Sequence, residues 1–194
     1  MSGRTDWVKW HEKYEGELAP RLATVQKMLR IALPGAERVI SACAGDGRDL
    51  LPLLEPQMRA RLIEIHPELC ARVPRLPNLE VVCADAGSSD AYVGAVPADV
   101  VLACGIFGNI SDADVERTVR SLPQICAEGG RVVWTRHRWE PDLTPAIRRW
   151  FAETGFEELA FESAGSEGWS VGLHVSRTPV QPLRPAERLF TFLR

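Results

Sequence analysis

Short, continuous apolar runs alternate with longer polar and amphipathic stretches through the middle of the chain. Five of these runs are rich in Val, Ile and Leu. Strands that are buried on both faces of a parallel sheet have this composition, and helical crossovers usually connect them. The pattern therefore predicts an α/β fold that binds ligands at the carboxyl ends of its strands. The expected strands are Val39–Ala42, Arg61–Ile65, Glu80–Ala84, Asp99–Ala103 and Arg131–Thr135.

Residues that start and stop helices lie in the connections between these runs. Pro67 stands at an expected first helical position, where a proline needs no N–H partner. Ser111 and the acidic residues after it are typical of a capped helix start. Thr144 and Pro145 open a further helix, which Gly155 ends.

The alternation stops near the carboxyl terminus. Phe156–Glu162 and Trp169–Ser176 are predicted to be two further strands, and only six residues join them. This joint is too short for a helical crossover, so we expect an antiparallel pair. The tail from Arg177 is rich in proline and ends in the apolar run Leu189–Phe192, which we expect to dock on the domain. The predicted fold is a Rossmann-like, seven-stranded, mostly parallel sheet with an antiparallel last strand pair.

Two helices are expected before the first strand. Aromatic residues recur at the spacing of one helix face near the start of the chain, and a second helix follows Pro20. Together they form a predicted N-terminal helical cap over residues 1–35, ahead of a ligand-binding domain over residues 36–194. The aromatic face either packs the cap against the sheet or forms a lid, in which Trp10 and Tyr14 contact the substrate. This face consists of Trp7, Trp10, His11 and Tyr14.

Composition and charge exclude several classes of function. The chain has 194 residues, of which 45% are apolar and 25% charged, with a net charge of −3. These values are those of a soluble globular protein and argue against a general nucleic-acid or anionic-membrane surface, which is normally basic. The five cysteines are odd in number and widely spaced, which favours reduced thiols over disulfides, and no bound metal is expected. Without a signal-peptide pattern or a membrane-length apolar run, we expect a cytoplasmic protein.

The first predicted strand runs into a turn of small residues, within the stretch Val39–Leu51. Gly45 and Gly47 can adopt positive φ or admit a ligand close to the backbone. We expect a helix to begin near Asp49, with its free N–H groups facing this glycine loop. A strand, a glycine loop and a helix start are typical of a nucleotide site, but an ordinary strand-to-helix connection has the same pattern.

A carboxylate ends the second predicted strand. Glu64 follows Gly45 by nineteen residues. At about this spacing in Rossmann-type sites, an acidic side chain accepts hydrogen bonds from the ribose hydroxyls. The alternative is a helix-capping or solvated glutamate.

Four stretches together resemble the class I S-adenosylmethionine-dependent methyltransferases, over roughly residues 38–176. They are the glycine loop, Glu64, the run Val82–Ala86 and the region Ala98–Trp134. The likeness is greatest to small actinobacterial-type enzymes of unknown substrate. It implies S-adenosyl-L-methionine as cofactor, with Asp85 at the adenine amino group and the next backbone N–H at the ring. The residues implied in cofactor binding are Ala44, Gly45, Asp46, Gly47, Glu64, Ile65, Asp85, Ala86, Cys104 and Gly105.

Two positions depart from this family pattern. Ser41 stands where the family usually has Asp or Glu, and Cys43 where it has a glycine. The missing carboxylate often holds the methionine amine, so we expect that end of the cofactor to be held differently. Asp46 and Asp49 are nearby alternatives, although either can cap the next helix. The Asp-Pro-Pro-Tyr sequence of amino-directed DNA methyltransferases is absent after the fourth strand, which argues against exocyclic base amines as acceptors.

The resemblance implies methyl transfer, for which we expect a small-molecule acceptor. The rival hypothesis is an NAD(P)-dependent oxidoreductase. Its Rossmann turn requires a third glycine, where this chain has Leu50 and Leu51, and its sheet does not end in an antiparallel strand pair. A third class is a non-catalytic partner or sensor that binds S-adenosylmethionine or S-adenosylhomocysteine. The oligomeric state is left open, a homodimer included.

Candidates for the chemistry follow the fourth and fifth strands. His137 is the predicted general base, because histidine exchanges a proton near neutral pH. Asn109 is predicted to position the acceptor, and Arg136 or Arg138 to hold a substrate carboxylate or phosphate. The alternatives are a turn residue for Asn109 and a solvated loop for the basic run. His174 is expected to fill a polar gap in the core.

Overall fold

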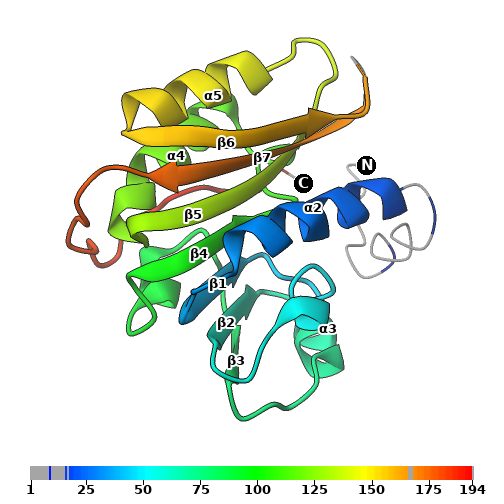
Figure 1. Cartoon of the computed structure of the whole chain (residues 1–194), viewed down its shortest axis with the longest axis vertical. Coiled ribbons are helices and arrows are strands. Elements are labelled where there is room, and N and C mark those ends of the chain that lie inside the picture. Colours follow the sequence, from blue (N-terminus) through cyan, green and yellow to red (C-terminus); the bar gives the residue numbers. More distant parts are fainter. Residues whose placement is uncertain (1–8, 10–15, 17, 166–167, 194) are drawn as a thin grey trace.

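The computed structural model describes residues 9, 16, 18–165 and 168–193. They form one seven-stranded sheet with the order β3-β2-β1-β4-β5-β7-β6 (Figure 1). Strands β1 to β5 run parallel, and β7 runs antiparallel to both β5 and β6. The predicted fold class is confirmed, including the antiparallel last pair. The strands are β1 Arg38–Ala42, β2 Arg59–Glu64, β3 Leu79–Cys83, β4 Ala98–Ala103, β5 Cys126–His137, β6 Phe156–Ser163 and β7 Trp169–Ser176.

Among the described residues, four α-helices begin where a cap or a proline marks the start. Oγ of Ser111 accepts the N–H of Asp114 at 3.1 Å and caps α4. Pro67 is the first residue of α3, and Pro145 lies in the first turn of α5. His66 precedes α3, but its side chain makes no capping hydrogen bond. The helices are α2 Ala19–Ala32, α3 Pro67–Arg72, α4 Asp112–Ser121 and α5 Thr144–Glu153.

The prediction of an α-helix directly after the glycine loop is wrong. The chain there forms only the 3₁₀ turn η2, Leu51–Leu53, and Leu54 is already extended. Two prolines explain the difference, because Pro52 lacks a backbone N–H and Pro56 disfavours helical backbone at the residue before it. The β3–β4 connection is likewise reduced to one such turn, η3, Ser89–Tyr92. In the described segment that follows the loop, therefore, no α-helix N-terminus faces it.

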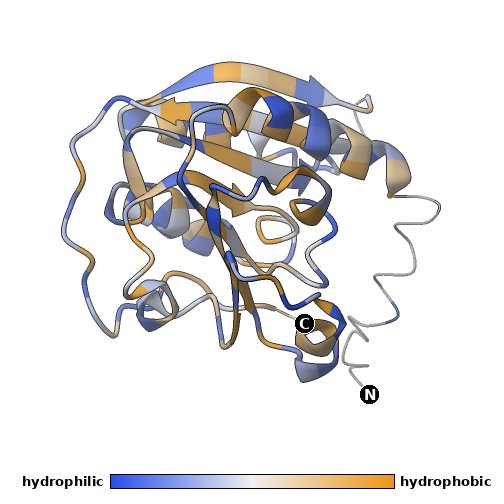
Figure 2. Ribbon diagram, turned by 60° about the horizontal axis from the view of Figure 1, so that its bottom comes forward, coloured by the Kyte–Doolittle hydropathy of each residue, from blue (hydrophilic) through white to orange (hydrophobic). Residues whose placement is uncertain are grey.

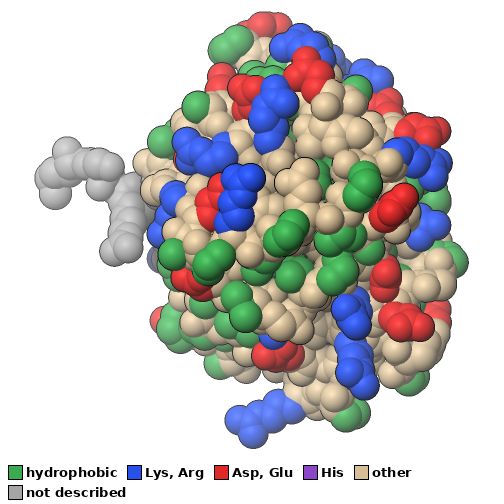
Figure 3. All heavy atoms as spheres, turned by 90° about the vertical axis from the view of Figure 1, so that its left-hand side faces the viewer, with side chains coloured by type: hydrophobic (Ala, Val, Ile, Leu, Met, Phe, Trp, Pro, Cys, Tyr) green, Lys and Arg blue, Asp and Glu red, His purple; other side chains and the backbone are tan. Residues whose placement is uncertain are grey.

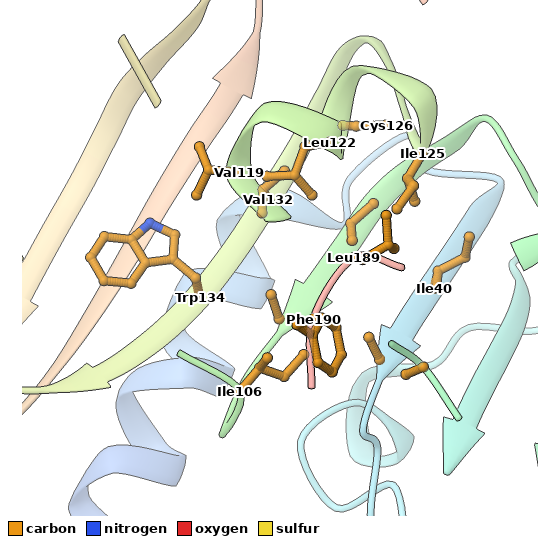
Figure 4. Close-up of a cluster of buried hydrophobic side chains, with 14 of the residues drawn as sticks. Ile40, Ile106, Val119, Leu122, Ile125, Cys126, Val132, Trp134, Leu189 and Phe190 are labelled. Atoms are coloured by element: carbon orange, nitrogen blue, oxygen red, sulfur yellow. The ribbon is translucent and has the colours of Figure 1, made fainter. Parts of the chain in front are cut away.

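The central strands are rich in hydrophobic residues (Figure 2). Their buried side chains form two clusters, one on each face of the sheet. On one face α4, α5 and the C-terminal tail pack over β1, β4 and β5, with Trp134 and Phe190 in the cluster (Figure 4). On the other face α2 and the segment around Leu50 pack over the same strands (Figure 1). Burial on both sides explains the continuous apolar runs of these strands. The predicted docking of the tail is confirmed by the burial of Leu189 and Phe190.

The predicted N-terminal cap is described only in part. Helix α2 buries Val25, Met28 and Leu29 against the sheet, within the same core as β1 and β4. The predicted aromatic helix, with Trp10 and Tyr14, lies outside the described residues. The division into a cap over residues 1–35 and a domain over residues 36–194 therefore stays a prediction.

A hydrogen-bonded tryptophan and histidine lie in the core between β5 and β7. Nε1 of Trp134 donates to Nδ1 of His174 at 3.1 Å, and Phe151 of α5 stacks on the imidazole with 4.2 Å between ring centroids. His174 therefore fills a polar position inside the core, as predicted. Burial lowers the pKa of its imidazole to about 4, while the charge of Glu158 raises it and that of Arg148 lowers it further.

We expect the free energy of unfolding to fall as the pH drops from about 6.5 to about 4. In this window only the unfolded chain takes up the proton on His174, because the folded protein keeps the imidazole neutral. The contribution is on the order of 2–3 kcal/mol and levels off at lower pH, where both states are protonated. Urea unfolding curves across this pH range measure it. In His174→Gln, whose amide oxygen can still accept from Trp134, this component should vanish, and an unaltered pH dependence would contradict the assignment.

Candidate functional site at the carboxyl ends of the strands

The predicted loop and carboxylate converge where β1 and β2 end. Glu64, the last residue of β2, is only 5% exposed. Its Oε2 accepts the N–H of Gly45 at 2.8 Å, and its Oε1 accepts the N–H of His66 at 2.9 Å. These two backbone donors fix the carboxylate, and each oxygen keeps a lone pair for a further donor. Glu64 is therefore a buried side chain held against the glycine loop, and not a solvated one.

The loop after β1 has a left-handed backbone even where glycine is absent. Gly45 and Gly47 have φ of 58° and 81°, and Cys43 has φ of 53°. A non-glycine residue in this region costs about 1 kcal/mol or more, so the surrounding structure must hold Cys43 in place. Burial, and then the charges of Glu64 and Asp85, raise the pKa of the Cys43 thiol. Cys43, Glu64 and Asp85 therefore lie together at one rim of the sheet.

Asp85, two residues beyond β3, completes this part of the rim. Its Oδ1 accepts the N–H of Gly87 at 2.7 Å, and its Oδ2 lies 2.5 Å from Nη1 of Arg188 in the C-terminal tail. Both side chains of this ion pair are about half exposed, so the carboxylate stays accessible, whereas the neighbouring Ala86 is buried. Sequence reasoning missed Arg188, because 103 residues separate it from Asp85 and no local pattern connects them.

An exposed apolar side chain lies beside the buried carboxylate. Ile65 directly follows Glu64 and is 56% exposed, whereas Ile63 is completely buried. A buried charge next to an exposed isoleucine reverses the usual distribution of side chains. Such a surface suits a flat apolar ligand such as a purine ring.

The loop after β4 is held by its own hydrogen bonds. The N–H of Gly105, whose φ is 74°, donates to Oγ1 of Thr135 at 2.8 Å. Nδ2 of Asn109 donates to the carbonyl of Gly105 at 2.8 Å. Asn109 therefore shapes this loop, which agrees with the alternative of a turn residue, and its contact with an acceptor stays a prediction. Cys104, at the start of the loop, is buried.

His137, the last residue of β5, lies against this loop. A Cβ atom on Gly108 would come within 2.9 Å of Cδ2 of His137, so the missing side chain lets the imidazole approach. Trp139 stacks on His137 with 4.6 Å between ring centroids and is 59% exposed. The structure therefore brings the predicted base next to the Asn109 loop. It also adds an exposed tryptophan that sequence reasoning missed.

Arg136 points into the protein. Its side chain is buried, its Nη1 donates to the carbonyl of Phe107, and its Nη2 lies 3.5 Å from Asp112 of α4. Burial lowers the pKa of the guanidinium, and the charges of Asp112 and Asp142 oppose this. Arg136 therefore clamps the β4–α4 loop to β5, and its contact with a substrate stays a prediction. Nε of the neighbouring Arg138 lies 2.9 Å from Asp142.

Charged residues also lie on the side of the loop predicted to hold the methionine end. Asp46 forms an ion pair with Arg48, 2.5 Å from its Nη2. Burial raises the pKa of the Cys104 thiol, the charge of Asp49 raises it further, and the charge of Arg21 lowers it. Arg21 is a buried residue of α2. A carboxylate and a guanidinium therefore lie near the end of β4. Sequence reasoning missed Arg21, although its place on the buried face of α2 was a signal.

A hollow of about 770 Å³ opens at the opposite rim, where β1, β2 and β3 begin. Arg38, Arg59 and Arg61 lie along it, and none of the predicted site residues does. Figure 3 shows the side on which β4 and β5 begin, where charged side chains of both signs are interspersed with apolar ones. We place the site at the rim of Glu64 despite this hollow, because open α/β sheets bind ligands at the carboxyl ends of their strands.

Comparisons with known proteins identify the fold. By sequence, neither a protein-family profile nor a curated protein matches the chain. Among solved structures, it is similar to 1,6-didemethyltoxoflavin-N1-methyltransferase from Burkholderia thailandensis with bound 1,6-didemethyltoxoflavin and S-adenosylhomocysteine, at a TM-score of 0.70 and 14% identity over 88% of this chain and 83% of that one. It is also similar to N-methyltransferase NodS from Bradyrhizobium japonicum WM9 with S-adenosylhomocysteine, at a TM-score of 0.63 and 15% identity over 80% and 87% of the two chains.

The chain has the fold of the class I S-adenosylmethionine-dependent methyltransferases. This methyltransferase fold differs from the dinucleotide-binding Rossmann fold in its antiparallel β7 between β5 and β6. The oxidoreductase alternative is therefore disfavoured. The 4+2 cyclase SpnF has the same fold, at a TM-score of 0.63 and 14% identity over 82% of this chain and 81% of that one, so the fold alone leaves the reaction open.

Three further observations concern the part of this methyltransferase fold that the structure describes. No helix in that part is long and apolar enough to cross a membrane. No three His, Cys, Asp or Glu side chains gather there as ligands for a metal ion. The five cysteines are free thiols, of which Cys104 and Cys126 are buried and Cys83 is exposed.

Proposed function

We propose that the chain binds S-adenosyl-L-methionine and transfers its methyl group to a small-molecule acceptor. The observation that carries the proposal is the buried carboxylate of Glu64, which the N–H groups of Gly45 and His66 hold at the rim of the sheet. Its remaining lone pairs can accept the two hydroxyls of a ribose. Methyltransferases of the same fold contain S-adenosylhomocysteine, which supports this choice of cofactor.

The other residues at the rim fit the rest of the cofactor. Ile65 offers an exposed apolar surface to a purine ring, and Asp85 offers an accessible carboxylate to its amino group. Arg21 and Asp49 place opposite charges near Cys104, which suits the carboxylate and the ammonium group of a methionine. When bound, the cofactor supplies an electrophilic methyl group on its sulfonium sulfur.

The acceptor is proposed to bind beside the ends of β4 and β5. Trp139 offers it an exposed aromatic face, and His137 can take the proton that an acceptor loses. Arg136 and Asn109 hold the loop against which the acceptor would be positioned. The net charge of −3 favours an enzyme that acts on small molecules and has no general affinity for nucleic acids. The free thiols favour a cytoplasmic location.

A non-catalytic binding protein is the second candidate, because the fold by itself leaves open whether the chain transfers a methyl group. Binding and transfer can be measured separately. Incubation of a metabolite extract with a methyl-labelled donor should move the label to a small molecule if the chain is an enzyme. Binding of S-adenosylhomocysteine without any labelled product would support a sensor or partner instead.

Thermal shift tests the choice of cofactor. At a concentration about one hundred times its dissociation constant, S-adenosylhomocysteine is expected to raise the melting temperature by roughly 5–10 °C. NAD and NADP are the controls and are expected to leave it unchanged, because the described segment after the glycine loop forms no α-helix whose N-terminus could bind their pyrophosphate. A shift with NAD and none with S-adenosylhomocysteine would refute the cofactor assignment.

A further inference from the structure

The C-terminal segment returns to the rim where the cofactor is proposed to bind. After β7 it runs behind the sheet in Figure 1, from the side on which β5 begins toward the side on which β5 ends. Leu189 and Phe190 anchor it in the core, near Ile40 of β1 and Ile106 of the β4–α4 loop (Figure 4). The residues after β7 are therefore an integral part of this face of the domain.

Backbone pairing holds this segment between two loops that flank the rim. The N–H of Leu189 donates to the carbonyl of Gly87 at 2.8 Å, in the loop after β3. The N–H of Leu193 donates to the carbonyl of Asn109 at 2.9 Å, in the loop after β4. A Cβ atom on Gly87 would come 2.3 Å from the carbonyl oxygen of Phe190, so only a glycine admits the segment this closely.

This pairing places the Arg188 side chain on Asp85. Arg188 and Ser88 form an antiparallel bridge, and Nη1 of Arg188 lies 2.5 Å from Oδ2 of Asp85. The guanidinium is about half exposed and carries five N–H donors, so the ion pair leaves donors for a ligand. Oδ1 of Asp85 is fixed by the N–H of Gly87 at 2.7 Å. A fixed acceptor and a charged donor therefore lie side by side.

We propose that Asp85 and Arg188 together recognise one edge of the adenine ring, an inference that rests on the proposed cofactor. This edge presents the exocyclic amino group, a donor, next to N7, an acceptor. Asp85 accepts from the amino group, and Arg188 donates to N7. A hypoxanthine ring carries a carbonyl in place of the amino group and would set its oxygen against the carboxylate. Asp85 thereby selects the amino group of adenine, and the tail supplies the donor to N7.

Calorimetry with S-adenosylhomocysteine and its 7-deaza analogue, in which a C–H replaces N7, tests this role. The wild-type chain is expected to bind the 7-deaza analogue roughly 5- to 10-fold more weakly, because it loses a charge-assisted hydrogen bond. Arg188→Ala is expected to lose a similar factor for S-adenosylhomocysteine and to bind the two ligands equally. If Arg188 only held Asp85 in place, Arg188→Ala would lower the affinity for both ligands by the same factor.

Arg184→Ala is the matched control, since Arg184 is an exposed arginine of the same segment whose side chain lies next to Glu187. It should bind both ligands as the wild type does, and melting temperatures should show that each variant is folded. Two results would overturn the proposed role of Arg188 and leave the proposed function standing. One is equal affinity of the wild type for the two ligands, and the other is an Arg188→Ala variant that still prefers S-adenosylhomocysteine to the 7-deaza analogue as strongly as the wild type does. If S-adenosylhomocysteine does not bind the wild type at all, the proposed function fails and this inference fails with it.

Discussion

Glu64→Gln is expected to lower the affinity for S-adenosylhomocysteine about 100-fold. In the wild type both carboxylate oxygens accept backbone N–H groups, from Gly45 at 2.8 Å and from His66 at 2.9 Å. A glutamine has only one oxygen, so its amide nitrogen must face one of these donors. The side chain then turns away or the glycine loop shifts, and the ribose hydroxyls lose their charged acceptor in either case.

Calorimetry measures the affinity, and circular dichroism with a melting curve shows that the variant is folded. Glu68→Gln is the matched control, because Glu68 is an exposed glutamate in the first turn of α3, four residues further on. It removes the same charge near the rim and should leave the affinity within about twofold, as expected for a screened surface charge. Wild-type affinity in a folded Glu64→Gln variant would remove the ribose assignment.

The strands and the place of Glu64 can be predicted from the sequence for the same physical reason. Strands β1 and β4 are buried on both faces, so they must be continuous apolar runs. Neighbouring parallel strands end at the same rim, so a loop after β1 and a carboxylate at the end of β2 must meet. Gly45 and Glu64 do so across nineteen residues.

Local rules fail where several of them compete. The apolar spacing after Gly47 favours a helix, but Pro52 and Pro56 leave only one 3₁₀ turn. The glycine loop therefore depends on Glu64 and on its own left-handed residues, and not on a helix N-terminus. Cys43 adopts a left-handed φ of 53° although it is not a glycine, which a sequence pattern cannot show.

Side-chain direction and long-range pairing also escape a sequence analysis. The predicted fifth strand ends at Thr135, but β5 continues through Arg136 to His137, and the Arg136 guanidinium turns to Phe107 and Asp112. Arg188 reaches Asp85 only because the tail docks through Leu189 and Phe190. The sequence around an exposed arginine does not indicate a partner 103 residues away, and the pairing becomes visible only when the course of the tail is known.

The residues proposed to bind the cofactor are held differently from those proposed to bind the acceptor. Glu64 and Asp85 are held by backbone N–H groups, so their positions follow from the strands and loops that carry them. His137 and Trp139 lie in a region that a substrate must complete, and the stacked pair is partly exposed. Adenosine recognition is therefore the part of the proposed function that single substitutions can test most sharply.

Gly172→Ala is expected to lower the free energy of unfolding by about 4 kcal/mol. Gly172 of β7 lies opposite Trp134 of β5, and a Cβ atom there would come 2.3 Å from Cε2 and 2.4 Å from Nε1 of the indole. The indole has no free space to move into, since it is fully buried, stacks on Phe151 and donates to His174. The added methyl group must therefore displace β7 or the indole in the middle of the core.

Thermal and urea unfolding measure this effect, and a drop of roughly 10 °C in melting temperature is expected for a domain of this size. Gly16→Ala is the control, because no atom of the described residues lies within 4 Å of a Cβ added there, and it should leave the melting temperature unchanged. Trp134→Leu is itself destabilising, but Gly172→Ala should cost far less in that background, since the smaller side chain leaves room for the methyl group. If Gly172→Ala lowers the free energy of unfolding equally in the wild type and in Trp134→Leu, the loss arises from the β7 backbone and not from the indole. A wild-type melting temperature in Gly172→Ala would contradict the packing of β5 against β7.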